Sequence, residues 1–274
     1  MNVAIIGCGY VGTAVARYWF EEQGLVVTVT TTTPERVPVL EAMGLRVVLV
    51  KGNDSDGLKS VVENQDTVLL SVGARNSQTY EETYLKTAQT LVSVLKQTTT
   101  VRQVIYTSSY ALYGNRDGAW VDETSPIAPG NGNAEIIAAT EQVLLSASSP
   151  QMQVCILRLG GIYGQGRELL KIFSRVAGMT RPGNGNEPTN WTHLDDIVGA
   201  IEFARLHQLQ GIYNLVDDAQ LTYREMLDQL CEQHGLAQIS WDPSLPSTRS
   251  YNARVSNQKI KDAGYQLIQP ERII

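Results

Sequence analysis

The fold is decided by one stretch near the start of the chain, Val3-Ala4-Ile5-Ile6-Gly7-Cys8-Gly9-Tyr10-Val11-Gly12. The apolar residues 3–6 predict a buried strand, and the glycine-rich residues 7–12 predict a turn. Residues 13–23 have helical periodicity and stop at Gly24, and residues 26–30 form a second β-rich run. This order of strand, turn, helix and strand predicts one βαβ unit.

The glycine turn has the spacing GxGxxG in the context that binds dinucleotides, between a strand and a helix. In that interpretation Gly7 permits the tight turn, Gly9 lets the backbone approach a pyrophosphate, and Gly12 lets the helix pack on the strand. The helix N-terminus attracts the anion. The predicted cofactor-binding residues here are Gly7, Gly9, Tyr10, Val11 and Gly12, and the alternative is a merely structural turn.

Outward from this unit, β-rich runs alternate with helix-length segments, which is typical of a parallel sheet covered on both faces. We expect strands at 46–50, 67–72, 103–107, 154–159 and 212–216, and helices at 34–43, 58–63, 80–97, 135–146 and 194–206. The pattern loosens into Gly, Pro and Asn clusters at 181–190, and two further helices are expected near 223–234 and 256–263. The predicted fold class is α/β, a doubly wound parallel sheet with a smaller C-terminal lobe.

The same pattern predicts the domain organisation. Residues 1–165, with return elements at about 191–216, form the expected dinucleotide-binding domain. Residues 166–190 and 217–274 form the expected substrate lobe.

Composition narrows the partners. The chain has 274 residues, 43% of them hydrophobic, and a formal net charge of -6 without a basic run, which argues against a nucleic-acid surface and favours a small-molecule substrate. Cys8, Cys155 and Cys231 are too widely spaced to indicate a disulfide framework or a metal site. No membrane-length apolar stretch or leader follows Met1, so we expect a cytoplasmic protein without a membrane partner.

The residues after the second and third strands bear on the choice between NAD and NADP. NAD-selective sites place Asp or Glu about 20 residues past the turn, and here that position is Thr31. A neutral Thr31 with Arg36 one helical turn away favours NADP over NAD, although the threonine run also suits a strand and an N-cap. Asn53 is suited to an adenine contact or equally to a turn. Gly73, after the fourth strand, joins the predicted cofactor-binding set.

Three later segments carry a family resemblance. Residues 106–114 (YTSSYALYG) are similar to an SSxxxYG signature, 157–167 (LRLGGIYGQGR) to LRxxxxYGPGR, and 191–197 (WTHLDDI) to xxHVDD. In this order they resemble the extended short-chain dehydrogenase/reductases, the NAD-dependent epimerase/dehydratase family. The resemblance implies a Rossmann domain, an NAD(P) cofactor and a substrate lobe.

The same resemblance implies a catalytic Ser or Thr with a Tyr and a Lys in YxxxK, and only the first is matched, by Ser109. The alignment puts Asn133 at the Tyr position and Ile137 at the Lys position. Gly161 stands where sugar-nucleotide enzymes often have Asn, which disfavours sugar-nucleotide epimerisation. Replacement proton carriers could be Tyr80, Tyr110, Tyr113, Tyr163 or His193, but for each of them a packing or structural role is favoured.

Two functions remain in competition at this point. The first is an NAD(P)-binding oxidoreductase or epimerase/dehydratase-like enzyme acting on a small carbonyl, hydroxyl or sugar-like substrate. The alternative is a catalytically degenerate NAD(P)-binding sensor or scaffold, and a flavin in the same turn is a third, minor interpretation. Helices 80–97 and 135–146 suit a homodimer interface or burial within their own domain. Arg249 and Arg254 suit a substrate phosphate or, by default, solvent.

Overall fold

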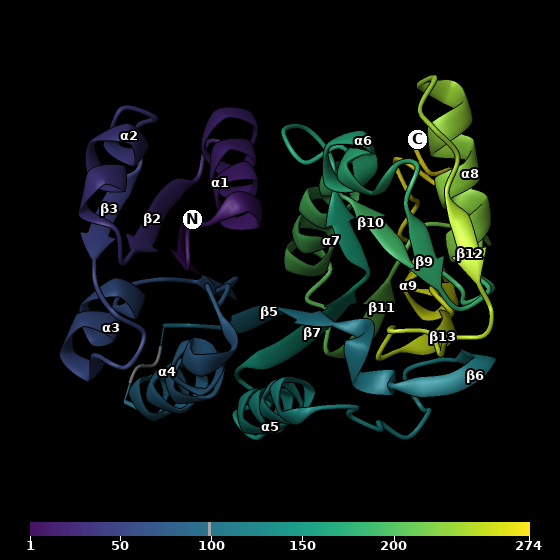
Figure 1. Cartoon of the computed structure of the whole chain (residues 1–274). Helices are drawn as coiled ribbons and strands as arrows, with labels where there is room; N and C mark the ends of the chain where they lie inside the picture. The colour runs from purple at the N-terminus through teal and green to yellow at the C-terminus, as the bar shows by residue number, and fades with distance from the viewer. Residues whose placement is uncertain (98–99) are drawn as a thin grey trace. The chain divides into compact units, whose positions relative to one another are not determined.

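The computed structural model describes residues 1–97 and 100–274, and its central element is a seven-stranded sheet (Figure 1). The strand order is β11-β7-β5-β4-β1-β2-β3. The strands are β1 (Asn2–Ile6), β2 (Val26–Thr31), β3 (Arg46–Leu49), β4 (Thr67–Leu70), β5 (Gln103–Ser109), β7 (Gln153–Leu159) and β11 (Gly211–Leu215). The predicted α/β class is confirmed.

The chain winds outward from β1 in both directions. It first adds β2 and β3 on one side, and then places β4 and β5 on the other, with these strand pairs all parallel. Ile6 of β1 stands opposite Leu70 of β4, so the strand order reverses between these two carboxyl ends. Ligands of doubly wound sheets bind at such a reversal.

The helices of the sheet agree with the predicted periodicity, but their ends differ. They are α1 (Tyr10–Arg17), α2 (Val37–Glu41), α3 (Ser55–Val62), α4 (Thr87–Leu95), α5 (Gly132–Leu145) and α7 (Leu194–Leu206). The first helix starts inside the predicted turn, at Tyr10, and continues as π-helix over Tyr18–Glu22. The helix expected at 58–63 starts at Ser55 because the Asp54 side chain accepts a hydrogen bond from the Gly57 N–H.

Two expected helices are broken. The segment 34–43 consists of a 3-10 turn, Pro34–Arg36, and the short α2, and Gly44 with a φ of 81° follows. The segment 80–97 consists of π-helix Glu81–Lys86 and then α4. Periodicity alone could not separate π from α turns, because both place apolar side chains against the sheet.

Several elements that follow β5 were not expected. They are β6 (Asn115–Val121), β8 (Gly161–Tyr163), β9 (Thr180–Pro182), β10 (Trp191–His193), β12 (Ser240–Asp242), β13 (Asn252–Val255) and α6 (Leu169–Phe173). The strands pair in parallel as β10 with β8, β12 with β9, and β13 with β6. Most of the strands have only three residues, and β6 contains Asp117 and Gly118 at positive φ. The sequence therefore shows no alternation of apolar and polar residues that would predict these strands. Two helices, α8 (Tyr223–Gln233) and α9 (Gln258–Asp262), lie close to their predicted positions.

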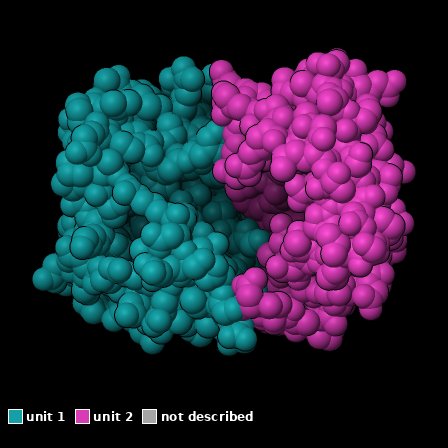
Figure 2. All heavy atoms as spheres, in the orientation of Figure 1, with its two compact units in different colours: residues 1–109, 132–158, 198–213 teal, residues 110–131, 159–197, 214–274 magenta. Residues whose placement is uncertain are grey.

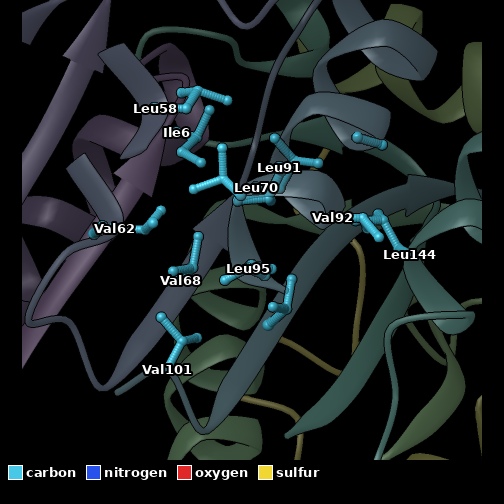
Figure 3. Close-up of a cluster of buried hydrophobic side chains, with 14 of the residues drawn as sticks. Ile6, Leu58, Val62, Val68, Leu70, Leu91, Val92, Leu95, Val101 and Leu144 are labelled. Carbon is cyan, nitrogen blue, oxygen red and sulfur yellow. The ribbon is translucent and has the colours of Figure 1, made fainter. Parts of the chain in front are cut away.

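The chain divides into two compact units (Figure 2). Unit 1 contains residues 1–109, 132–158 and 198–213, and unit 2 contains residues 110–131, 159–197 and 214–274. The core of unit 1 packs β4 and β5 against α3 and α4 through side chains such as Leu58, Leu70 and Leu91 (Figure 3). One core of unit 2 packs α8 around Met226 and Leu230.

A buried ion pair ties three elements of unit 1 together. Arg158 on β7 donates to Glu141 on α5, with Nη2 2.7 Å from Oε2 and Nε 3.0 Å from Oε1. Ser108 on β5 donates its hydroxyl to the same carboxylate at 2.5 Å. Both charged side chains are 4% exposed, so the two buried charges compensate each other through this hydrogen-bonded ion pair.

Unit 2 contains a comparable buried pair near the end of the chain. Arg272 donates to the Asp217 carboxylate at 2.8 and 2.9 Å and to the Thr189 hydroxyl at 2.5 Å. The Arg272 and Asp217 side chains are 0% and 1% exposed. The C-terminal segment is therefore fastened inside unit 2.

Substituting Glu141→Gln should lower the free energy of unfolding by about 3 to 5 kcal/mol, because it leaves the Arg158 charge buried without a counter-ion. The exposed pair of Glu81 with Lys86 offers a control, and Glu81→Gln should change the stability by less than about 0.5 kcal/mol. Urea denaturation of both variants measures the difference. Equal losses would contradict a structural role for the buried pair.

Candidate functional site

The path of the glycine turn is fixed by the strands on either side of it. Gly7 has a φ of 93°, and a Cβ at this position would lie 2.6 Å from the Ser71 carbonyl oxygen. The Gly7 N–H donates to Thr30 Oγ1 and the Cys8 N–H donates to the Thr30 carbonyl, both at 2.9 Å. Any side chain at Gly7 would separate the turn from the residue that follows β4.

The other two glycines of the turn differ in what surrounds them. A Cβ at Gly12 would lie 2.4 Å from the Gly7 carbonyl oxygen and 3.3 Å from Ile5 Cγ2, so Gly12 allows α1 to approach β1. A Cβ at Gly9 would meet no heavy atom of the described residues within 4 Å. Close packing therefore explains why positions 7 and 12 are glycine. At Gly9 the absence of a side chain leaves the backbone accessible to a ligand.

Gly9 is also the N-cap of α1. Within the described chain no side chain caps this helix end, and Tyr10 and Val11 form its first turn, Tyr10 half-buried and Val11 buried. The positive end of the helix dipole is consequently offered to whatever lies in front of Gly9.

Gly73 lies just after β4, the strand that pairs with β1. A Cβ built on Gly73 would likewise meet no described heavy atom within 4 Å. Next to it, the Ala74 N–H donates to the Tyr84 hydroxyl at 3.4 Å. Gly73 and Gly9 thus follow the two neighbouring strand ends at which the sheet order reverses, and a Cβ at either would meet open space among the described residues.

Two arginines reach the threonines that follow β2 or lie on α1. Arg36 Nη2 lies 3.0 Å from Thr13 Oγ1 on α1, and Arg75 Nη2 lies 3.0 Å from Thr33 Oγ1. Buried Thr31 accepts the Thr33 N–H through its hydroxyl and closes a small turn. Sequence reasoning missed Arg75, because it lies 42 residues from Thr33 and no local pattern joins them.

Cys8 and Asn53 have structural partners in unit 1. Burial raises the pKa of the Cys8 thiol, with the Thr13 hydrogen bond and the Arg36 charge opposing the shift, so the thiol stays protonated. Exposed Asn53 lies in the turn after β3 and donates its amide N–H to Glu82 Oε1 at 3.1 Å.

Ser109 is the last residue of β5, and it is half-buried. Asn133 stands in the first turn of α5 and donates its amide N–H to Ser77 Oγ at 3.2 Å. Ile137, one helical turn further along, is 6% exposed. An amide and a buried alkyl chain have no proton to exchange near neutral pH, so these two positions cannot perform Tyr and Lys chemistry.

The alternative proton carriers in unit 2 have partners of their own. Tyr113 donates its hydroxyl to Asn214 Oδ1 at 2.8 Å in a buried contact. Burial raises the pKa of Tyr163 to about 12, and its hydroxyl accepts a backbone N–H of the C-terminal segment at 3.2 Å. His193 Nδ1 accepts the Asp195 N–H at 3.3 Å. Tyr110 is buried against Tyr251, and in unit 1 Tyr80 lies against Tyr84.

The described residues, 1–97 and 100–274, offer neither a candidate metal centre nor a membrane-spanning helix. They contain no group of three or more His, Cys, Asp or Glu side chains placed to hold a metal ion. Nor do they contain a helix with the length and apolar character needed to cross a membrane.

Known proteins share this sequence pattern and this fold. Over 130 residues the chain is 32% identical to the epimerase family protein ML0860 of Mycobacterium leprae, a match that spans 46% of this chain and 42% of that relative. The human epimerase family protein SDR39U1, solved with NADPH, superposes with a TM-score of 0.77 at 19% identity, covering 99% of this chain and 96% of that one. The UDP-glucose 4-epimerase of Thermus thermophilus, solved with NAD, gives 0.77 at 22% identity over 97% and 94%. At these identities the two structures establish the fold alone.

The model of the NAD dependent epimerase/dehydratase family matches residues 3–215, which include the glycine turn, Ser109 and the LRLGGIYG segment. Because this match covers most of the chain, the protein belongs to the NAD dependent epimerase/dehydratase family, as an atypical member that lacks YxxxK.

Proposed function

We propose that this chain is an NADP(H)-dependent oxidoreductase or epimerase/dehydratase-like enzyme acting on a small substrate that carries a carbonyl or hydroxyl group. One observation carries the proposal. Gly9 and Gly73 lie at the strand-order reversal, and neither glycine is explained by packing among the described residues. A ligand that runs across both backbones, as a dinucleotide does, would explain them.

The residues present fit such a cofactor. The N-terminus of α1 would hold the pyrophosphate, and the segment after β2 would receive the adenosine ribose. The solved NADPH complex of the human family member and the NAD complex of the Thermus epimerase support this class of ligand. Unit 2 would serve as the substrate lobe.

The two arginines after β2 and β4 favour NADP. A 2′-phosphate carries about two negative charges. Arg75 contacts Thr33, just after β2 where the ribose would lie, and Arg36 follows the same segment and contacts Thr13 on α1. Thr31 adds no negative charge that would repel the phosphate.

Catalysis would rest on Ser109 and on the cofactor. When bound, the nicotinamide supplies hydride exchange. Ser109 would hold a substrate oxygen by a hydrogen bond at the end of β5. Since Asn133 and Ile137 cannot move a proton, water or another side chain must do so, and a rate about 10²- to 10⁴-fold below a complete site is expected.

A second function is favoured by the chemistry of two positions. Asn133 is engaged with Ser77, and Ile137 is buried, so the proton relay expected of the family is absent where the alignment places it. A protein that binds NADP(H) without turnover, and passes the cofactor state to a partner, would need no relay.

Substituting Gly9→Ala should weaken NADPH binding about tenfold or more and leave stability nearly unchanged, because the new methyl enters the space in front of α1. Substituting Gly12→Ala should instead lower the free energy of unfolding by about 1 to 3 kcal/mol, because the methyl overlaps the Gly7 carbonyl. NADPH fluorescence titration and urea denaturation measure the two effects. Undiminished NADPH affinity in the Gly9 variant would refute cofactor binding at the turn.

Wild-type protein should bind NADPH more tightly than NADH. Arg75→Gln and Arg36→Gln should each weaken NADPH binding about tenfold, the cost of a lost charge-assisted phosphate contact, and leave NADH affinity within about twofold. Arg17→Gln on α1, which removes an exposed charge paired with Glu21, is the matched control. A tighter complex with NADH in the wild type would overturn the preference.

A panel of carbonyl substrates, followed by nicotinamide absorbance, tests turnover. If one is reduced, Ser109→Ala should lower kcat/KM about 10²-fold while NADPH affinity stays the same, because a transition-state hydrogen bond to the substrate oxygen is lost. Full activity in this variant would remove Ser109 from the reaction. Tight NADPH binding without turnover across the panel would favour the sensor function.

A further inference from the structure

Unit 2 contains two arginines that share one tyrosine ring. The guanidinium carbon of Arg181 lies 5.3 Å from the centre of the Tyr223 ring, and that of Arg249 lies 4.7 Å from it. Arg249 is also 5.3 Å from the centre of the Tyr251 ring. We call these four residues the arginine–tyrosine cluster. Stacking on an aromatic face leaves the N–H edge of a guanidinium available for an anion.

The charges of the cluster are not neutralised within the described residues. The buried or half-buried arginine and lysine side chains that do form ion pairs, those of Arg158, Arg205, Lys261 and Arg272, each lie within 3 Å of a carboxylate. Neither Arg181 nor Arg249 has such a partner in residues 1–97 and 100–274. Burial raises the pKa of Tyr223, the charges of Arg181 and Arg249 oppose that shift, and nearby Glu187 adds to it without forming an ion pair with either arginine.

The Arg249 side chain also has a buried hydrogen-bond donor that lacks an acceptor among the described residues. Its Nε is buried without a hydrogen-bond acceptor among the described residues, and its Nη2 reaches only the Pro188 carbonyl at 3.5 Å. The indole N–H of Trp241, a ring in contact with Tyr223, is buried and unpartnered among those residues as well. Buried donors of this kind are rare and cost free energy unless an acceptor reaches them.

Arg224 shows what a structural arginine in the same place looks like. It lies 5.2 Å above the Trp241 ring, and its Nε donates to the Asn184 carbonyl at 2.9 Å. Its hydrogen bond is therefore used to hold a loop, while Arg181 and Arg249 have no comparable bond within the described part of the chain. The contrast sets these two arginines apart from ordinary surface packing.

The aromatic platform is held firmly. Tyr223 is the first residue of α8, behind a capping box formed by Thr222 and Glu225, and its N–H donates to the Glu187 carbonyl at 2.9 Å. Arg181 stands on β9 opposite Trp241 on β12. The rings under both guanidiniums are thus fixed before any ligand arrives, which lowers the entropic cost of binding.

We propose that Arg181 and Arg249 bind an anionic group of the substrate, a phosphate or a carboxylate. Each planar guanidinium offers paired N–H donors to the oxygens of such a group, and both guanidinium carbons lie within 5.3 Å of the centre of the Tyr223 ring. The inference rests on the proposed function in taking unit 2 as the substrate lobe, and it narrows the substrate to a compound that carries negative charge.

Calorimetric titration of the full chain with inorganic phosphate, pyrophosphate and succinate at low ionic strength tests the site. Saturating NADP⁺ is kept present so that the glycine turn of unit 1 is occupied. One anion should bind, and Arg249→Gln or Arg181→Gln should weaken it about tenfold or more. Arg175→Gln, which removes an exposed charge of unit 2 without disturbing the cluster, should change the affinity by less than about twofold.

Arg249→Lys is the control for misfolding, because it keeps the positive charge but loses the planar pair of N–H donors. This variant should bind the anion more weakly than wild type but more tightly than Arg249→Gln. Phosphate or pyrophosphate binding identifies a phosphorylated substrate, and succinate binding alone identifies a carboxylate. No anion binding, or equal losses in the Arg175 control, would overturn the site. NADPH affinity measured on the same variants without added NADP⁺ separates this failure from failure of the proposed function, since only the latter abolishes cofactor binding.

Discussion

The close approach of α1 to β1 is the constraint on which unit 1 depends. Gly12 allows it, because only a hydrogen atom fits between the helix and the Gly7 carbonyl. This contact directs the N-terminus of α1 at the edge where β1 and β4 end side by side. A larger residue at position 12 would tilt the helix and move its dipole away from that edge. The packing of α1 on the sheet and the candidate cofactor site therefore both require glycine at this position.

The sequence predicted the elements of unit 1 best. Strands such as β1 and β4 are continuous apolar runs buried on both faces, and that signal survives without knowledge of neighbours. The short strands of unit 2 carried no such signal. β9 and β12 have three residues each, and their pairing across about 60 residues of chain follows from tertiary contacts alone.

The candidate site was predicted unevenly for the same reason. Local spacing indicated the glycine turn, and a resemblance of motifs indicated Ser109, Asn133 and Ile137 as the positions to examine. The partners that act at long range stayed hidden. Glu141 on α5 compensates the buried charge of Arg158 on β7, and Arg75 contacts Thr33 from a distant loop. Ion pairs between distant segments of the chain produce no periodic pattern in the sequence from which they could be predicted.

The buried pair of Arg272 and Asp217 has a consequence for how the chain folds during synthesis. Asp217 and Thr189 are made dozens of residues before Arg272, and until that arginine has left the ribosome the carboxylate has no buried counter-charge. The last strand of the sheet, β11, ends at residue 215, so the sheet can be completed earlier. The ion pair of Arg272 with Asp217 in unit 2 forms only after residue 272 has emerged from the ribosome.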